Sequence, residues 1–154
     1  MRNNTNIVLI ADSGSTKTDW LLLKGKDELS RFSTQGINPF MLTESEITTI
    51  LATELPQLPA SVESIHFYGA GCRGDLSAIV KSAIQSLFLT ANIQVESDLL
   101  GAARSVCGNE PGIACILGTG SNSCLYDGKI IVENVSPLGY ILGDEGSGAV
   151  MGKH

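Results

Sequence analysis

The pattern of apolar and polar positions opens with three short segments that have the character of β-strands. Residues 7–12, 18–23 and 28–33 are brief apolar or alternating runs, and each ends at turn-forming residues. The connecting segments, 13–17 and 24–27, contain glycine and are only a few residues long. We therefore predict that the chain begins with a three-stranded antiparallel meander.

Helical and strand patterns then alternate. Residues 43–55, 75–89 and 99–106 carry apolar side chains at helical spacing, whereas residues 64–68 and 93–96 are short apolar runs typical of buried strands. Strands that alternate with helices after a meander predict an α/β sheet covered by helices.

The first predicted helix carries a specific start signal. Thr43 is a favourable N-cap residue, and Glu46 lies three residues later, as in a capping box. Ile47, Ile50 and Leu51 then recur on one helical face. The helix is predicted to bury this face against the sheet.

The opening pattern returns about a hundred residues later. Residues 112–117 predict a strand, a Gly-Thr-Gly-Ser turn follows, and residues 122–126 and 129–133 predict two further strands. This is a weak internal repeat of a hairpin with a glycine-rich turn. Because residues 108–112 are rich in Gly and Pro, we predict an N-terminal lobe over 1–110 and the beginning of a second lobe over 111–154.

Composition narrows the range of partners. The 154 residues are 43% hydrophobic and 17% charged, with a net charge of −6, which suits a packed soluble domain and disfavours nucleic acid as the main partner. No apolar run is long enough to span a membrane, and no signal-peptide core follows the N-terminus. The four cysteines form no C-x-x-C pair, and reduced thiols in a cytoplasmic protein are expected.

The two glycine-rich turns are the first indication of chemistry. Glycine allows a sharp bend, and successive N–H groups in such a turn can form a nest that binds phosphate. The predicted phosphate-binding residues are Gly14, Ser15, Thr16 and Lys17 in the first turn and Gly118, Thr119, Gly120 and Ser121 in the second. One such turn is weak evidence, whereas two copies between strands favour a nucleotide site. No G-x-x-x-x-G-K-[ST] motif is present.

Five segments, in order along the chain, resemble motifs of the N-acetylglucosamine kinases and the BadF/BadG/BcrA/BcrD ATPases. They are 12–19 (DSGSTKTD), 36–39 (GINP), 96–102 (ESDLLGA), 117–121 (LGTGS) and 142–148 (LGDEGSG), with Gly139 before the last. The resemblance implies an actin-like (ribonuclease H-like) ATPase fold: a lobe with the antiparallel meander extended by parallel strands and flanked by helices, and the start of a second similar lobe. It implies ATP and Mg²⁺ as cofactors and a sugar as the substrate.

The resemblance also implies roles for single residues. Asp98 corresponds to the general base that accepts the proton of the sugar hydroxyl, and Asp12 to the residue that holds Mg²⁺ through water. The implied substrate-binding residues are Asn38, Gly71, Thr119, Gly143 and Asp144. Taken alone, Asp98 is more often a helix cap, whereas Asp12 is as often a turn-capping residue as a metal-binding one. The position of Asp98 between the two turns is what favours a catalytic role for it.

Three functions remain open on this evidence. The leading one is ATP-dependent phosphorylation of a sugar hydroxyl, on N-acetylglucosamine or a related amino sugar. The second is an ATPase activator of a 2-hydroxyacyl-CoA dehydratase, and the third a non-catalytic sugar-sensing or actin-like module. Because the family's chains are longer, we expect this chain to be inactive alone. Strands left unpaired in a shortened second lobe would favour homodimerisation or aggregation.

Overall fold

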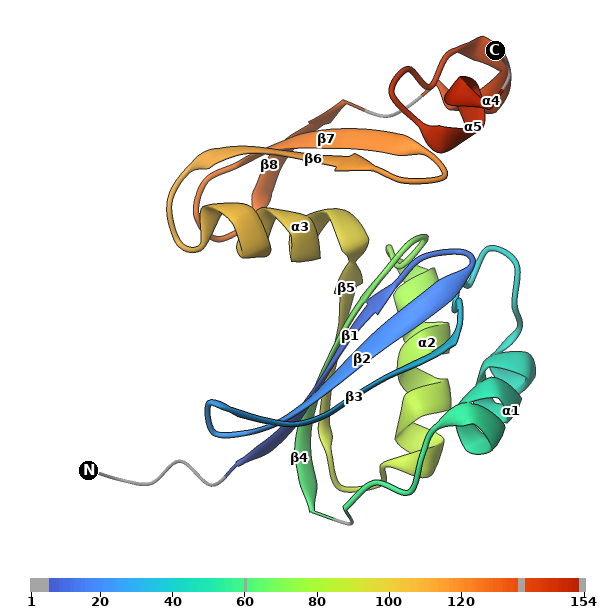
Figure 1. Cartoon of the computed structure of the whole chain (residues 1–154), viewed down its shortest axis with the longest axis vertical. Helices are drawn as coiled ribbons and strands as arrows, with labels where there is room; N and C mark the ends of the chain where they lie inside the picture. The colour runs from blue at the N-terminus through green and yellow to red at the C-terminus, as the bar shows by residue number, and fades with distance from the viewer. Residues whose placement is uncertain (1–5, 60, 136–137, 153–154) are drawn as a thin grey trace. The chain divides into compact units, whose positions relative to one another are not determined.

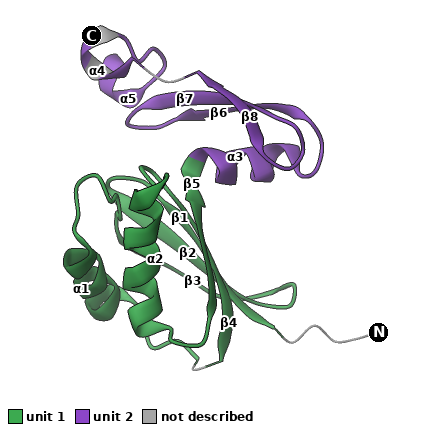
Figure 2. Ribbon diagram, turned by 180° about the vertical axis from the view of Figure 1, so that it is seen from behind, with its two compact units in different colours: residues 1–98 green, residues 99–154 purple. Residues whose placement is uncertain are grey.

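The computed structural model describes residues 6–59, 61–135 and 138–152 (Figure 1). The chain divides into two compact units, residues 1–98 and residues 99–154, which we describe separately (Figure 2). The predicted lobe boundary after residue 110 would have placed the helix after Asp98 with the first unit. In the structure this helix belongs to the compact second unit. The assignment of lobes in terms of function stays a prediction.

The first unit is a five-stranded mixed sheet with two helices. Its elements are β1 (Ile7–Ser13), β2 (Lys17–Lys24), β3 (Asp27–Gln35), α1 (Glu44–Glu54), β4 (Val62–Gly69), α2 (Asp75–Leu87) and β5 (Asn92–Ser97). The strand order is β3-β2-β1-β4-β5. The pairs β1–β2 and β2–β3 are antiparallel, whereas β1–β4 and β4–β5 are parallel. The predicted meander extended by parallel strands is therefore confirmed.

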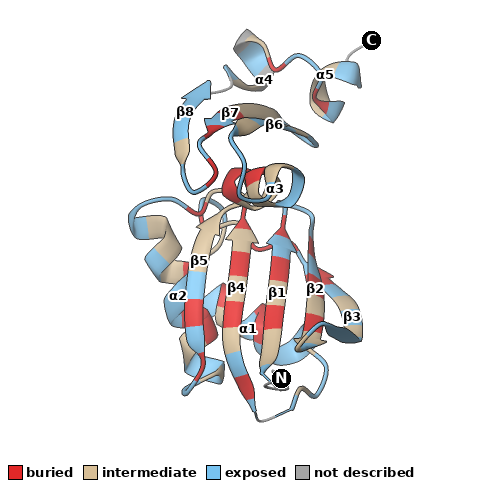
Figure 3. Cartoon of the chain, turned by 90° about the vertical axis from the view of Figure 1, so that its left-hand side faces the viewer, coloured by how far each residue is buried: buried red, intermediate tan, exposed pale blue. Residues whose placement is uncertain are grey.

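Helices α1 and α2 cover the same face of this sheet (Figure 3). Trp20 of β2 is buried in the hydrophobic core, stacked on Phe32 with ring centroids 6.2 Å apart and tilted against Phe67 at 5.9 Å. Its indole Nε1 donates to Thr34 Oγ1 at 3.0 Å, which satisfies the one polar group of the ring. The predicted capping box is present, because Thr43 and Glu46 exchange side-chain to backbone hydrogen bonds.

Within residues 99–135 and 138–152, the second unit is a three-stranded antiparallel sheet with three helices, the first of which starts at Asp98. Its elements are α3 (Asp98–Cys107), β6 (Gly112–Leu117), β7 (Ser121–Tyr126), β8 (Ile131–Val135), α4 (Gly139–Leu142) and α5 (Gly148–Met151). Leu99, Leu100 and Ala103 of α3 form an apolar cluster with residues of β6 and β7. On the opposite face of the sheet, Ile113, Leu117 and Leu125 are exposed. One face of this sheet is therefore packed and the other carries exposed apolar side chains.

Differences from the predicted elements are small and have local causes. The last predicted strand, 129–133, starts later, at Ile131, because the Asp127 carboxylate accepts the backbone N–H groups of Lys129 and Ile130 and holds them in a turn. Helix α2 ends at Leu87, before the predicted end at residue 89. The one-turn helices α4 and α5 were not predicted, since four residues are too few to show a helical period.

Candidate active site

Three parallel strands of the first unit end in one row. Ser13 of β1 pairs with Gly69 of β4, and Gly69 pairs with Ser97 of β5, each as the last residue of its strand. The backbone N–H of Ala70 donates to Ser13 O at 2.8 Å, so the first two strand ends stay bonded beyond the sheet. Asp98 follows directly after Ser97. This edge of the sheet therefore gathers the first glycine turn, the 69–72 turn and Asp98.

The first glycine turn is closed tightly and backed by a second segment. Gly14 N–H donates to Lys17 O at 2.9 Å, and Gly36 N–H donates to Thr16 O at 3.1 Å. A Cβ atom at Gly36 would lie 2.5 Å from Gly14 O and from Ser15 C, closer than real contacts allow. Only glycine therefore lets the end of β3 approach this turn. Gly36 was part of the matched GINP segment, but its role in supporting the turn had no signal in the sequence.

Buried hydroxyl groups fix the base of the same turn. Ser13 Oγ lies 2.6 Å from Thr18 Oγ1, and both residues are fully buried. Ser13 Oγ also lies 3.0 Å from both the backbone N and the backbone O of Ile37, and it accepts the hydrogen bond from that N–H. Buried polar atoms that bond one another in this way hold a backbone rigidly. The first turn is thus preformed by neutral groups.

Charged residues lie on the exposed side of the hairpin formed by β1 and β2. Asp12 is exposed and stands opposite Asp19 in the strand register. The Lys17 amine lies 2.8 Å from Asp19 Oδ2, so its side chain turns toward this carboxylate. Hydrogen bonds from Lys17 and then from Ser33 lower the pKa of Asp19. Asp12 therefore presents an exposed carboxylate beside the turn, while the Lys17 amine is paired with Asp19.

Asn38 connects the first turn to the segment after β4. Its amide Nδ2 donates to Ser15 Oγ at 3.1 Å, and its Oδ1 accepts the backbone N–H of Phe40 at 3.0 Å. Gly71 has φ +80°, and a Cβ atom there would overlap Asn38 Oδ1. The two predicted substrate-binding residues of this unit, Asn38 and Gly71, are therefore in direct contact. Their predicted role stays a prediction.

Asp98 lies close to this contact. It is the first residue of α3 and is half-buried. Burial, and then the negative charge of Asp98, raises the pKa of the Cys72 thiol to about 12. Because Cys72 follows Gly71 directly, the Asp98 carboxylate is near the turn that carries Gly71. The structure thus brings Asn38, Gly71 and Asp98 to one edge of the first sheet.

The second glycine turn is held by a carboxylate. Asp144 Oδ1 accepts the backbone N–H of Ser121 at 2.9 Å and the Ser121 hydroxyl at 2.7 Å. These hydrogen bonds lower the pKa of the Asp144 carboxyl group. Asp144 is buried, with 7% of its surface exposed. Gly118 N–H donates to Gly120 O at 2.9 Å, and Gly148 N–H donates to Gly118 O at 2.7 Å. Asp144 therefore shapes this turn, a role that the resemblance did not suggest for it.

A pocket of about 340 Å³ adjoins the second turn. Ser121, Gly143 and Asp144 contribute to its wall, so two predicted substrate-binding residues and one predicted phosphate-binding residue share it. Thr119 does not line it. Its backbone O accepts from Ala149 N–H at 3.3 Å instead. In the second unit, Ser121, Gly143 and Asp144 thus lie together at the second glycine turn.

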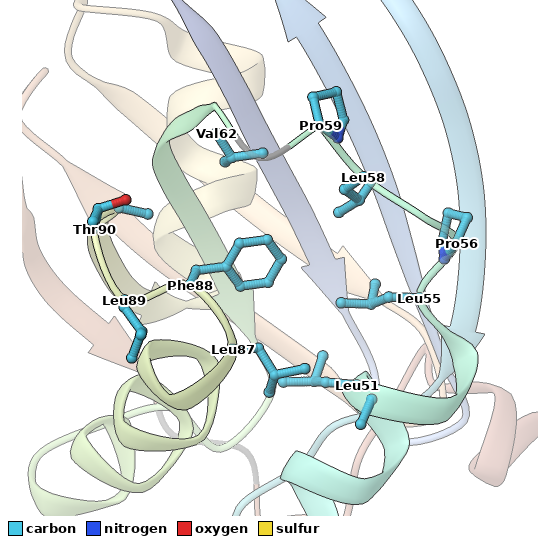
Figure 4. Close-up of a pocket in the computed structure, with 12 residues that line it drawn as sticks. Leu51, Leu55, Pro56, Leu58, Pro59, Val62, Leu87, Phe88, Leu89 and Thr90 are labelled. Atoms are coloured by element: carbon cyan, nitrogen blue, oxygen red, sulfur yellow. The ribbon is translucent and has the colours of Figure 1, made fainter.

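A second pocket, about 440 Å³ in volume, contains none of the predicted site residues (Figure 4). It is apolar and lies between the ends of α1 and α2, where Leu55, Phe88 and Leu89 contribute to its wall. It is formed mainly by the last turns of the two helices and the residues that follow them, whereas the site residues lie at or after the strand ends. The motifs, and not pocket volume, therefore identify the site.

Membrane-spanning helices and ready-made metal clusters are both absent from the part of the chain that the structure describes. No helix within 6–59, 61–135 and 138–152 is long and apolar enough to cross a bilayer. Within the same ranges, no three His, Cys, Asp or Glu side chains form a ready-made metal cluster. A single exposed carboxylate such as Asp12 fits a magnesium ion that keeps several water ligands, which is how Mg²⁺ is usually bound beside phosphates.

Comparisons with solved structures show which class the fold belongs to. The chain superimposes on an assigned N-acetylglucosamine kinase from Porphyromonas gingivalis with a TM-score of 0.91 and 55% identity, over 95% of this chain and 53% of that chain. An assigned N-acetylglucosamine kinase from Chromobacterium violaceum superimposes with a TM-score of 0.71 and 22% identity, over 97% of this chain and 55% of that chain. A ROK hexokinase from Thermus thermophilus superimposes with a TM-score of 0.52 and 18% identity, over 82% of this chain and 47% of that chain. No protein-family model and no curated protein matches the chain.

The fold is therefore that of the actin-like ATPases, as the motifs predicted. With 55% identity over nearly its whole length, the chain belongs to the family of N-acetylglucosamine kinases that the Porphyromonas gingivalis structure represents. It spans about half the length of these relatives.

Proposed function

We propose that the protein phosphorylates a sugar hydroxyl with ATP, and that its acceptor is N-acetylglucosamine or a related amino sugar. The observation that carries this proposal is the row of strand ends in the first unit. It places a preformed glycine turn, the Asn38–Gly71 contact and the Asp98 carboxylate at one edge of one sheet. A phosphate-binding turn, a sugar-contacting amide and a base are the parts that such a transfer requires.

Each part has a defined task in this proposal. Asp98 takes the proton from the acceptor hydroxyl, because a carboxylate at the start of a helix next to the Gly71 turn can face a bound sugar. Asn38 orients the acceptor, and its bond to Ser15 ties that orientation to the first phosphate turn. Mg²⁺, held by Asp12 through water, would neutralise phosphate charge. Phosphoryl transfer depends mainly on such positioning and neutralisation.

The phosphates would be held by the two glycine turns. The first comprises Gly14, Ser15, Thr16 and Lys17, and the second comprises Gly118, Thr119, Gly120 and Ser121. Thr119, Gly143 and Asp144 are proposed to contact the acceptor from the second unit. The family membership of the chain supports this assignment, as does the hydrogen bonding that preforms both turns. A cytoplasmic location and a homodimer are part of the same proposal.

Calorimetry on the chain tests this proposal directly. N-acetylglucosamine and a panel of hexoses would be titrated with and without Mg-ADP, together with an assay of sugar-dependent ADP release. Because this chain is expected to be inactive alone, sugar binding is the main readout. Asp98→Asn should retain that binding and abolish any sugar-dependent ADP release that the unaltered chain shows. Asp75→Asn is the matched control, because Asp75 is also the first residue of a helix and is exposed. Failure of the folded chain to bind any sugar would contradict the proposal, and ATP hydrolysis without sugar would favour the activator function.

A further inference from the structure

Phe40 is an exposed aromatic residue beside the residues proposed to bind the acceptor. Its exposed fraction is 58%, and it lies in the segment that connects β3 to α1. Its backbone N–H donates to Asn38 Oδ1 at 3.0 Å. A single exposed apolar residue needs no explanation by itself. The neighbours of this ring are what make it informative.

The ring lies against two residues of the segment after β4, Gly71 and Arg73. A Cβ atom at Gly71 would lie 2.7 Å from Phe40 Cδ2, so the ring packs directly on the backbone there. The Arg73 guanidinium carbon lies 5.2 Å from the ring centroid, within the range of a cation–π contact. No ion pair occupies Arg73 among the residues that the structure describes. The guanidinium of Arg73 therefore has the Phe40 ring as its neighbour.

This edge of the sheet carries both polar groups and an apolar surface, on different residues. Asn38 and Asp98 can serve the hydroxyl groups of an acceptor, whereas Phe40 offers an apolar surface on the same segment as Asn38. Binding sites commonly pair a few placed polar groups with an aromatic wall that fits the apolar part of the ligand. In an N-acylated amino sugar, the apolar part is the acyl methyl group.

We propose that Phe40 is a specificity-determining residue that contacts the acyl group of the acceptor, and that Arg73 is a positioning residue that holds its ring. This inference rests on the proposed function and deepens it. The ring selects acylated amino sugars over unsubstituted hexoses, because an acyl methyl group gains apolar contact that a hydroxyl does not. One such methyl contact changes discrimination by about tenfold or more.

The test compares the affinity of the chain for N-acetylglucosamine and for glucose. Phe40→Ala should weaken N-acetylglucosamine binding about tenfold and leave glucose binding nearly unchanged, whereas Phe40→Tyr should keep the preference. Leu89→Ala is the matched control, since Leu89 is an exposed apolar residue of the same unit that lines the other pocket. It should change neither affinity.

The contact between Arg73 and the Phe40 ring is tested by the chemical shifts of the Arg73 side-chain protons, which a general loss of structure would not change in the same way. The Arg73 side-chain proton signals should be shifted upfield by the ring in nuclear magnetic resonance spectra, and Phe40→Ala should remove that shift. Arg73→Gln should weaken N-acetylglucosamine binding about two- to threefold, as expected for an exposed cation–π contact. Arg73→Lys should restore most of that loss.

The outcomes separate this inference from the function on which it rests. Equal loss of both sugars in Phe40→Ala, or no loss of either, overturns the inference while the proposed function stands. A folded wild-type chain that binds neither sugar overturns both. An unshifted Arg73 signal overturns the positioning role of Arg73 alone.

Discussion

The two glycine turns follow the same local plan but are supported in different ways. The first is held by buried neutral hydroxyls at Ser13 and Thr18 and by the close approach of Gly36, all from the meander that contains it. The second is held by one carboxylate, Asp144, and by Gly148, both more than twenty residues downstream. The first turn is therefore a product of its own hairpin, whereas the second depends on later parts of the chain.

This difference has a physical consequence for the two turns. Neutral hydroxyls do not titrate in the accessible range of pH, so the first turn should keep its shape wherever the unit is folded. A carboxylate loses its acceptor strength when it is protonated, so the second turn should weaken in acid. Sequence similarity between two turns thus does not imply similar stability.

The largest expected difference between the two units is in cysteine reactivity, because one cysteine near each site differs in burial. Cys72, beside the 69–71 turn, has a pKa of about 12 and is buried, so its thiolate at pH 8 is about a thousandfold scarcer than that of an ordinary cysteine. Cys115, on β6 before the second turn, is exposed. Alkylation followed by mass spectrometry should therefore label Cys115 and spare Cys72. Rapid labelling of Cys72 in the folded chain would contradict the buried site.

Gly36→Ala should cause the largest loss of stability in the first unit. The new Cβ atom would overlap the backbone at Gly14 and Ser15, and overpacking of this kind costs about 2 to 3 kcal/mol. Urea unfolding followed by the fluorescence of the buried Trp20 measures this loss. Gly14→Ala is the control, because its nearest neighbour would be 3.7 Å away, at Lys17 O. Equal stability of the two variants would disprove the close approach.

Ser13→Ala should cost somewhat less, about 2 kcal/mol, because it leaves the buried N–H of Ile37 without its acceptor and removes one of the two partners of the Thr18 hydroxyl, which keeps its bond to Gln35 O. This loss should be the same at pH 7 and pH 3, since no ionisable group is involved. Ser33→Ala provides the control, because that hydroxyl is exposed where it donates to Asp19. A loss that changes with pH would mean that a charged group supports the first turn as well.

The smallest effect should be the acid sensitivity of the second turn. Hydrogen bonds lower the pKa of folded Asp144 below its ordinary value of 3.8, so its stabilising contribution is complete above pH 3.8 and is lost as the pH falls through the folded pKa. The amide signal of Ser121 should titrate with a midpoint below 3.8. Asp144→Asn should abolish this titration, and a midpoint above 3.8 would show that the bond to Ser121 does not form.

Local patterns in the sequence predicted most of the fold. The capping box at Thr43 and the apolar runs of the strands act over a few residues, so they are visible without tertiary structure. The motifs also named Asn38, Gly71 and Asp98, and the structure places these residues near one another, while their roles stay predictions. The comparisons confirm the fold and the family that the motifs indicated.

Features that depend on distant contacts were not predictable. The approach of Gly36 to Ser15 and the bond from Ser121 to Asp144 join segments about twenty residues apart, and nothing in either segment specifies its partner. The compact second unit begins at Leu99, because α3 buries its apolar face against β6 and β7, and no local breaker marks that position. The lobe boundary predicted from the breakers near Pro111 stays a prediction. Packing decides such boundaries.

The turn between β2 and β3 has a practical use that follows from the length of the strands. Gly25 and Lys26 close this turn at the end of β2 opposite the first glycine turn. Eight residues of extended strand span about 26 Å. A fluorescent label attached at Lys26 would thus be a fixed distance from the phosphate-binding turn, far enough not to touch a ligand and near enough for energy transfer to a labelled nucleotide. The length of β2 would thus set a known distance for measuring nucleotide binding by energy transfer.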